Sequence, residues 1–134
     1  MSDPMPSSPE ILALGPVMPV IVIDDAAQAV PLAHALLAGG IRTIEITLRT
    51  PAALEAVRLV ATDCPDITVG AGTVNNAALA KQARDAGAAF AVSPGTTASV
   101  INGCADAGLP LLPGAAPVSE MMELQAAGFS AVQL

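Results

Sequence analysis

Charged and hydroxyl-bearing side chains recur at every second position of the segment TIEITLR, residues 43–49. In a β-strand, alternate residues point to opposite faces, so this spacing gathers Glu45 and Arg49 on one face. A carboxylate can transfer protons, and a guanidinium can bind another carboxylate through two parallel hydrogen bonds. Burying either charge is costly unless it is paired or used. The segment therefore predicts a functional site or, alternatively, a structural ion pair between Glu45 and Arg49.

Small or rigid residues directly follow three other apolar runs, in the sequences VGAGTV (69–74), SPGT (93–96) and LPGAAP (112–117). The glycines Gly70 and Gly72 are expected to let the backbone approach a ligand closely. Thr73 would add a hydroxyl at the same place, and Pro94 would make a rigid turn. A tight turn without a ligand is the alternative interpretation of GAGT.

A repeating unit organises the chain around these segments. The dipeptide Ala-Gly occurs at 38–39, 86–87, 107–108 and 127–128, each time after a helix-like stretch and before a short apolar run. Glycine after a helix commonly supplies the left-handed residue that ends it. With two further apolar runs at 17–23 and 66–71, six strands are expected to start near positions 17, 41, 66, 89, 110 and 130. The helices expected between them cover 25–38, 51–62, 75–86, 97–107 and 117–127, with Thr50 and Asn75 as candidate N-caps.

Alternating strands and helices predict an α/β fold with a parallel sheet and right-handed crossovers. A doubly wound open sheet and a (β/α)8 TIM barrel both fit, and the short, nearly constant spacing favours the barrel. The missing GxGxxG turn after the first strand favours it too. We expect one domain over residues 1–134 with a flexible N-terminus at 1–7. Because such barrels close with eight units, the domain is expected to be incomplete, with five βα units and a sixth strand.

Composition excludes several classes of function. Twelve acidic and five basic residues give a net charge of −7, which argues against a nucleic-acid partner. Cys64 and Cys104 have no metal-binding spacing, so we expect free thiols and no metal site. The first ten residues carry acids and prolines instead of a basic signal region, and no apolar run is long enough to span a membrane. The prediction is a cytoplasmic protein.

Four motifs together resemble one enzyme family. TIEITLRT (43–50), VGAGTV (69–74), FAVSPGTT (90–97) and LLPGAAPVSE (111–120) are similar, in this order, to motifs of bacterial aldolases. Those aldolases act on 2-keto-3-deoxy-6-phosphogluconate (KDPG) and 2-keto-4-hydroxyglutarate (KHG). The segment GPVMPVIVID (15–24) resembles their first strand, and the similarity extends to residue 134.

The resemblance implies a homotrimeric TIM barrel that cleaves KDPG to pyruvate and glyceraldehyde 3-phosphate through a lysine Schiff base. No cofactor is implied, and the partner is a small keto acid. Glu45 would be the general acid and base. Arg49 and Thr73 would hold the pyruvate carboxylate, and Pro94 would form part of the pocket wall.

The sequence departs from the family at the nucleophile, because Gln133 stands where the family has its Schiff-base lysine. A glutamine amide has no nucleophilic amine, so this chain is expected to be inactive. The only lysine, Lys81, falls within an expected helix and is interpreted as a solvated residue. The phosphate-binding loops that the family has after strands seven and eight are also expected to be missing. The alternatives are a non-catalytic keto-acid binder, a subunit of an assembly, or a phosphate-binding barrel such as a thiamine-phosphate synthase.

Overall fold

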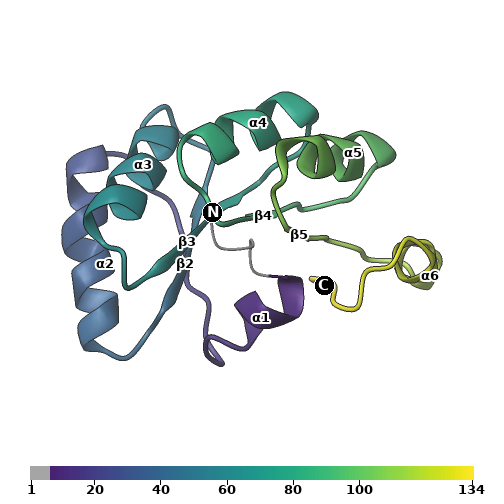
Figure 1. Ribbon diagram of the computed structural model, residues 1–134, viewed down its shortest axis with the longest axis horizontal. Helices are drawn as coiled ribbons and strands as arrows, with labels where there is room; N and C mark the ends of the chain where they lie inside the picture. The colour runs from purple at the N-terminus through teal and green to yellow at the C-terminus, as the bar shows by residue number, and fades with distance from the viewer. Residues whose placement is uncertain (1–6) are drawn as a thin grey trace, which may run out of the picture.

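Five parallel strands form one sheet in the computed structural model, which describes residues 7–134 (Figure 1). The strands are β1 (Val20–Ile21), β2 (Thr43–Thr47), β3 (Thr68–Gly72), β4 (Phe90–Val92) and β5 (Leu111–Leu112). Their order in the sheet follows their order in the chain, and every pair of neighbours is parallel. This sequential arrangement confirms the predicted TIM-barrel family of folds, because a doubly wound sheet reverses its strand order.

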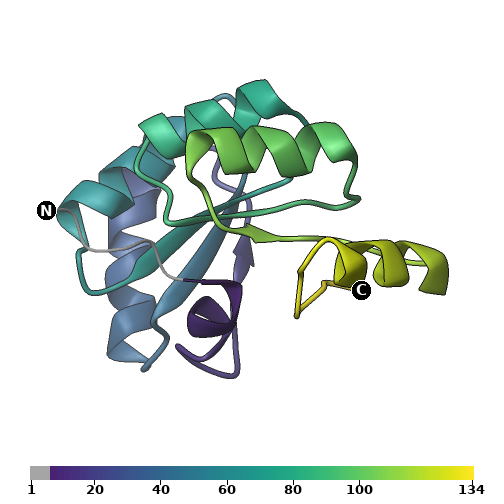
Figure 2. The same cartoon turned by 45° about the vertical axis from the view of Figure 1, so that its right-hand side comes forward.

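Helices connect the strands and lie mostly along one face of the sheet. They are α2 (Ala29–Ala38) with the preceding 3₁₀ turn η1 (Ala26–Gln28), α3 (Ala53–Asp63), α4 (Ala77–Asp85), α5 (Ala98–Ala107) and α6 (Val118–Ala126). In Figures 1 and 2, α2 to α5 cover the same face, and α6 stands at the end of the row beyond β5. A short helix that we did not predict, α1 (Ser8–Leu12), lies on the opposite, inner face.

Two groups of buried side chains fill the two faces. On the outer face, Ile44 and Ile46 of β2 pack in one core with Val57 and Val60 of α3. On the inner face, Ile11 of α1 packs with three strand residues of β4 and β5: Phe90, Val92 and Leu112. The unpredicted helix α1 is thus held by its one buried side chain, Ile11, and by the Ser8 hydroxyl, which donates to the Leu111 carbonyl at 2.8 Å.

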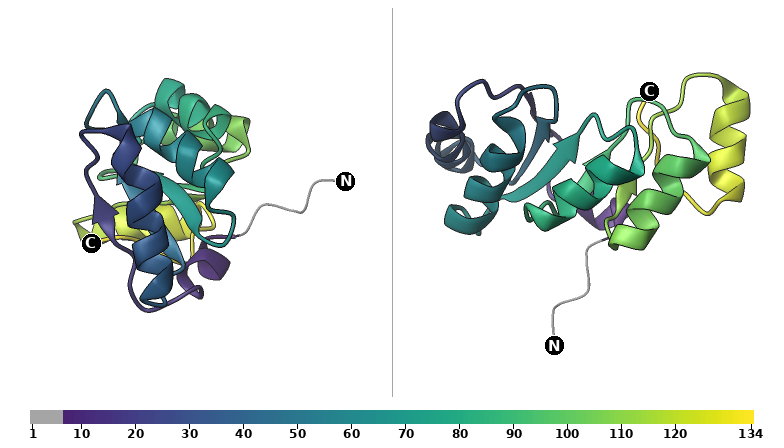
Figure 3. Two further views of the ribbon diagram at one scale, coloured as in Figure 1. Left: turned by 90° about the vertical axis from the view of Figure 1, so that its left-hand side faces the viewer. Right: turned by 90° about the horizontal axis from the view of Figure 1, so that it is seen from above.

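The predicted sixth strand is reduced to an isolated parallel bridge between Gly114 and Gln133. The backbone amide of Gln133 donates to the carbonyl of Pro113 at 2.8 Å, and the backbone amide of Ala115 donates to the backbone carbonyl of Gln133 at 2.9 Å. The segment after α6 therefore follows the edge of β5 but pairs with it at a single residue. Figure 3 shows this segment beside the end of the sheet.

Two helix ends differ from the prediction by one residue. The N-cap of α4 is Asn76, whose side chain accepts from the amide of Leu79 at 2.9 Å, and not Asn75. The left-handed residue after α2 is Gly40, with φ of 84°, because Gly39 still has a negative φ. Thr50 does not cap α3, since its hydroxyl donates to the carbonyl of Ile23.

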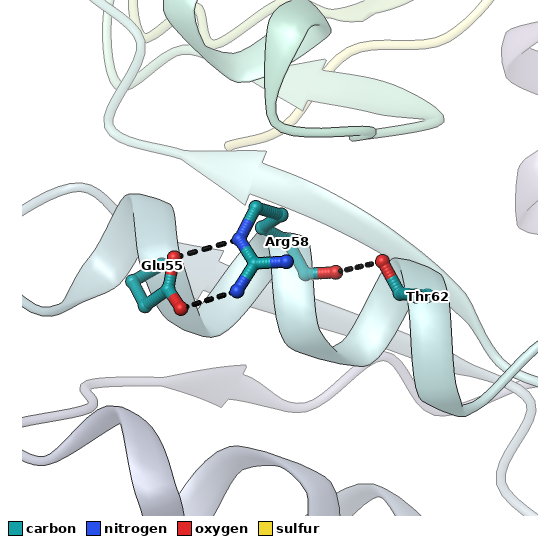
Figure 4. Close-up of polar contacts among 3 residues, drawn as sticks. All are labelled: Glu55, Arg58 and Thr62. Carbon is teal, nitrogen blue, oxygen red and sulfur yellow. Dashed lines mark hydrogen bonds and ion pairs between the residues drawn. The ribbon is translucent and has the colours of Figure 1, made fainter.

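The charged residues of the helices lie on their solvent faces. On α3, the Arg58 guanidinium pairs with Glu55, with Nε to Oε2 at 2.8 Å, and the Thr62 hydroxyl donates to the Arg58 carbonyl at 2.8 Å (Figure 4). On α4, Lys81 pairs with Asp85 at 2.6 Å and is exposed, as predicted. Over residues 7–134, no helix is both long and apolar enough to cross a membrane. Of the N-terminal stretch predicted to be flexible, residues 1–6 lie outside the described part, and Ser7 caps α1.

Candidate functional site

Glu45 is the one carboxylate buried in the sheet over the described residues, and only 5% of it is exposed. Its neighbours in β2 fix this placement. Ile44 and Ile46 enter the core under the helices, so the side chain between them must point to the inner face. Burial raises the pKa of Glu45 above that of an ordinary glutamate, and the positive charge of Arg49 offsets part of that rise. A carboxyl that keeps its proton closer to neutral pH is suited to proton transfer.

A pocket of about 280 Å³ lies on this inner face and contains two of the predicted site residues, Glu45 and Gln133. The rest of its lining is apolar: Leu12, Met18, Val20, Val92, Leu112, Ala131 and Val132. The lining comes from α1, four strands and the segment after α6. The geometry thus brings the acid of β2 and residue 133 to the same cavity, although 88 positions separate them in the chain.

Arg49 and Thr73 form a second pair of predicted residues, just beyond the ends of β2 and β3. The Arg49 Nε donates to the Thr73 hydroxyl at 3.2 Å. No ion pair joins Arg49 to Glu45 in the described part of the chain, so the alternative of a structural ion pair between them is wrong. Neither Arg49 nor Thr73 lines the pocket. Arg49 is exposed, and its guanidinium is accessible to an anion at this end of the sheet.

Thr73 has an unusual backbone for its residue type. Its φ of 60° is the only positive value at a non-glycine residue between positions 7 and 134. The left-handed region is unfavourable for a β-branched side chain because Cβ comes too close to the following carbonyl oxygen. Strain of this kind often occurs where a side chain must be presented in one direction. Here the strained residue is the one that receives the hydrogen bond of Arg49.

Pro94 lies in the exposed loop after β4 and does not line the pocket with Glu45. A buried hydroxyl network holds this loop against the loop after β5. The hydroxyls of Ser93 and Thr96 lie 2.8 Å apart, and Thr96 donates to the Gly114 carbonyl at 2.9 Å. The Gly114 amide in turn donates to Ser93 at 3.3 Å. Because Gly114 also bridges to Gln133, the network connects the loop of Pro94 to the segment of Gln133.

The glycines of GAGT serve a purpose that we did not predict. The space beside Gly70 and Gly72 is occupied by side chains of this same chain, and not left open to a ligand. A Cβ on Gly70 would overlap the ring of Phe90, and one on Gly72 would overlap the side chain of Glu45. The register could have revealed this, because Glu45 and Gly70 are partners in the sheet and alternate residues share a face.

No group of three or more histidine, cysteine or acidic side chains between residues 7 and 134 is arranged to hold a metal ion. Cys64 and Cys104 are buried free thiols whose pKa values are raised by burial. His34 is exposed on α2, away from the inner face. The chemistry that the described residues offer is therefore that of Glu45, Arg49, Thr73 and Gln133.

Comparison with known proteins places this geometry in a family. A family model described as KDPG and KHG aldolase matches residues 9–134. The 2-dehydro-3-deoxy-phosphogluconate aldolase of Pseudoalteromonas atlantica is 49% identical over 116 residues, covering 87% of this chain and 54% of that protein. The KHG/KDPG aldolase of Escherichia coli is 47% identical over the same length, also 54% of its own. The chain thus spans about half the length of the curated relatives it matches.

Solved structures agree with the sequence matches. A KDPG aldolase from Legionella pneumophila, with pyruvate captured as a covalent carbinolamine intermediate, has a TM-score of 0.89 at 43% identity and is matched over 93% of this chain and 61% of its own. The aldolase of Zymomonas mobilis ZM4, solved with 3-phosphoglycerate, has a TM-score of 0.87 at 44% identity, over 92% of this chain and 59% of its own.

Proposed function

The chain belongs to the KDPG and KHG aldolase family, and from this membership we propose that it carries an aldolase site in which Gln133 replaces the nucleophile. The family resemblance implies cleavage of KDPG to pyruvate and glyceraldehyde 3-phosphate through a Schiff base. An imine forms when a free amine attacks the ketone and water leaves. The glutamine nitrogen is an amide and cannot do this, so the chain does not form the Schiff base.

The observation that carries the proposal is the pocket shared by Glu45 and Gln133. A proton carrier must lie within reach of the reacting group, directly or through one water. Glu45 is on the same cavity wall as residue 133, is buried and has a raised pKa. We therefore assign Glu45 the role of general acid and base toward a group bound at position 133.

Binding of the keto acid is assigned to the neighbouring strand ends. A guanidinium offers two parallel donors to a carboxylate, which matches the carboxylate of pyruvate. Arg49 is accessible and is oriented by its bond to Thr73, so these two residues would hold that carboxylate. Pro94 would form part of the wall beside the pyruvyl group. By the same resemblance, the protein would assemble as a homotrimer.

Reductive trapping tests the replaced nucleophile. The chain is incubated with pyruvate and borohydride, and its intact mass is measured beside that of the Gln133→Lys variant. We expect the mass of a reduced pyruvyl group on Gln133→Lys, at residue 133, and no adduct on the parent chain. A Gln133→Met variant, which also lacks an amine, is the matched control and should stay unmodified. A stable adduct on the parent chain at any residue would overturn the proposal.

A non-catalytic keto-acid binder is the second candidate, and the retained Arg49–Thr73 pair favours it. Calorimetric titration with pyruvate distinguishes a keto-acid binder from a chain that binds no keto acid. Heat of binding that disappears in Arg49→Ala supports the binder. No heat at millimolar pyruvate removes it and leaves a role as an assembly subunit.

A further inference from the structure

Two glycines of β3 stand beside Glu45 on the inner face. In the parallel register, Gly70 is the partner of Glu45, and Gly72 is the partner of Thr47. Both glycines are buried, and neither has the positive φ that would require glycine for backbone reasons. Their missing side chains must therefore be explained by space and not by backbone conformation.

The space at Gly72 is taken by one side chain. A Cβ placed there would lie 2.8 Å from Cδ and 2.9 Å from Cγ of Glu45, and closer still to Oε1. Carbon atoms in contact are normally about 3.5–4.0 Å apart, so an alanine would not fit unless Glu45 moved. The Glu45 carboxylate thus rests directly against the backbone of Gly72.

Little else fixes the carboxylate. Between residues 7 and 134, no hydrogen bond or ion pair holds the Glu45 oxygens, and Arg49 is the charged group that acts on them. A flexible glutamate without hydrogen-bonding partners is placed by the shape of its surroundings. The buried neighbours in β2 determine the face on which Glu45 lies. The gap over Gly72 determines where its carboxylate lies on that face.

We propose that Gly72 is a positioning residue for the proton carrier, because its missing side chain forms the seat that keeps the Glu45 carboxylate inside the pocket next to residue 133. The inference rests on the role proposed above for Glu45. With the seat filled, the carboxylate must turn toward solvent, where it no longer faces a group bound at position 133 and no longer loses its hydration.

The test follows the Glu45 carboxyl itself, without any ligand. Carbon-13 NMR of side-chain-labelled glutamate gives its titration midpoint in the parent chain, Gly72→Ala and Gly70→Ala. We expect Gly72→Ala to lower the midpoint toward that of an exposed glutamate, because the carboxyl regains water. Gly70→Ala is the matched control on the same strand. Its methyl meets the Phe90 ring instead, so the midpoint should stay that of the parent even though the protein loses stability.

A second pair of variants tests the proposal if Gly72→Ala alone does not fold. With Glu45→Ala in the background the seat is empty, so Glu45→Ala/Gly72→Ala should fold and melt within a few degrees of Glu45→Ala alone. In the Glu45→Ala background, Gly70→Ala should lower the melting temperature as much as it does in the parent chain. An unchanged titration midpoint in a folded Gly72→Ala, or failure of the double variant to fold, would overturn the seat.

Trapping in the Gln133→Lys background separates the seat from the proposed function. Addition of Gly72→Ala should slow pyruvate trapping by about 100-fold, the low end of what a positioned acid and base contributes. A lowered midpoint with unchanged trapping would leave the seat in place and remove the catalytic role of Glu45. An unchanged midpoint would overturn the seat itself.

Discussion

Single residues on the inner face are placed by what surrounds them more than by bonds of their own. The Glu45 carboxylate accepts no hydrogen bond from residues 7–134 and rests in the gap left by Gly72. Thr73 shows the opposite case, because it accepts a hydrogen bond from Arg49 while its backbone stays in an unfavourable region. Such strain costs about 1–3 kcal/mol, so the surrounding structure must offset it. We interpret the strain as a cost of presenting the Thr73 hydroxyl to Arg49.

Replacement of Thr73 should separate stability from binding. Asparagine tolerates a left-handed backbone, so Thr73→Asn should raise the free energy of unfolding by roughly 0.5–1 kcal/mol. It should also weaken pyruvate binding about 5-fold, because Arg49 loses its hydroxyl partner. Denaturant unfolding and calorimetry measure the two effects. Thr73→Val keeps the strain and loses the hydroxyl, so it should lose affinity without gaining stability. A destabilised Thr73→Asn would contradict the strain argument.

Helices and strands follow the sequence more closely than the site does. The four Ala-Gly dipeptides and the spacing of the apolar runs located five helices to within a few residues, because helix ends and apolar runs are local signals. The helix α1 was missed, since five residues with one buried side chain carry no periodic pattern. The first and sixth strands were predicted too long, because hydrogen-bonded pairing depends on a neighbour and not on composition alone.

The site was predictable only in part for the same reason. Alternation within one strand predicted an inner-face position for Glu45, and the structure places Gln133 in the lining of the same pocket. The role of Gly72 could not come from its own strand, because it depends on the register with β2. The ion pair considered between Glu45 and Arg49 failed because Arg49 lies beyond the end of β2 and bonds to Thr73 in the next loop.

The N-terminus of α4 gives a test at the scale of an element. Asn76 accepts the hydrogen bond that caps the helix, whereas Asn75 only accepts from the Asn76 side chain. Asn76→Ala should therefore cost about 1 kcal/mol of unfolding free energy. Asn75→Ala, its neighbour of the same type, should stay within roughly 0.5 kcal/mol of the parent. Chemical denaturation of both variants measures the difference, and equal losses would show that the cap is shared.

The whole sheet has an exposed apolar edge along β1. Val17, Val20 and Val22 are 55%, 55% and 51% exposed. Within the described residues, β1 pairs only with β2, so its other side offers free backbone groups beside apolar side chains. Edges of this kind pair with other chains unless they are covered or charged. The molecule should therefore associate through this edge as its concentration rises.

A lysine at the edge should reduce that association. We expect Val22→Lys to raise the dissociation constant of self-association by about 10-fold, the effect of roughly 1.4 kcal/mol. Analytical ultracentrifugation over a range of concentrations measures it. Ala35→Lys adds the same charge to an exposed position of α2 and should leave the association unchanged. A parent chain that stays monomeric with a sharp, cooperative melt would refute the expectation.

The sequential order of the strands also bears on how the chain folds. Val20 pairs with Glu45 and Ala91 pairs with Leu111, so strand partners lie only roughly 20–25 residues apart. Each new strand can join an edge that already exists, at a nearly constant cost in loop entropy. Assembly can thus proceed from the N-terminus during synthesis, with one helix and one strand added at each step. The pocket of Glu45 and Gln133 is then among the last features to form, because residue 133 joins only after β5 is in place.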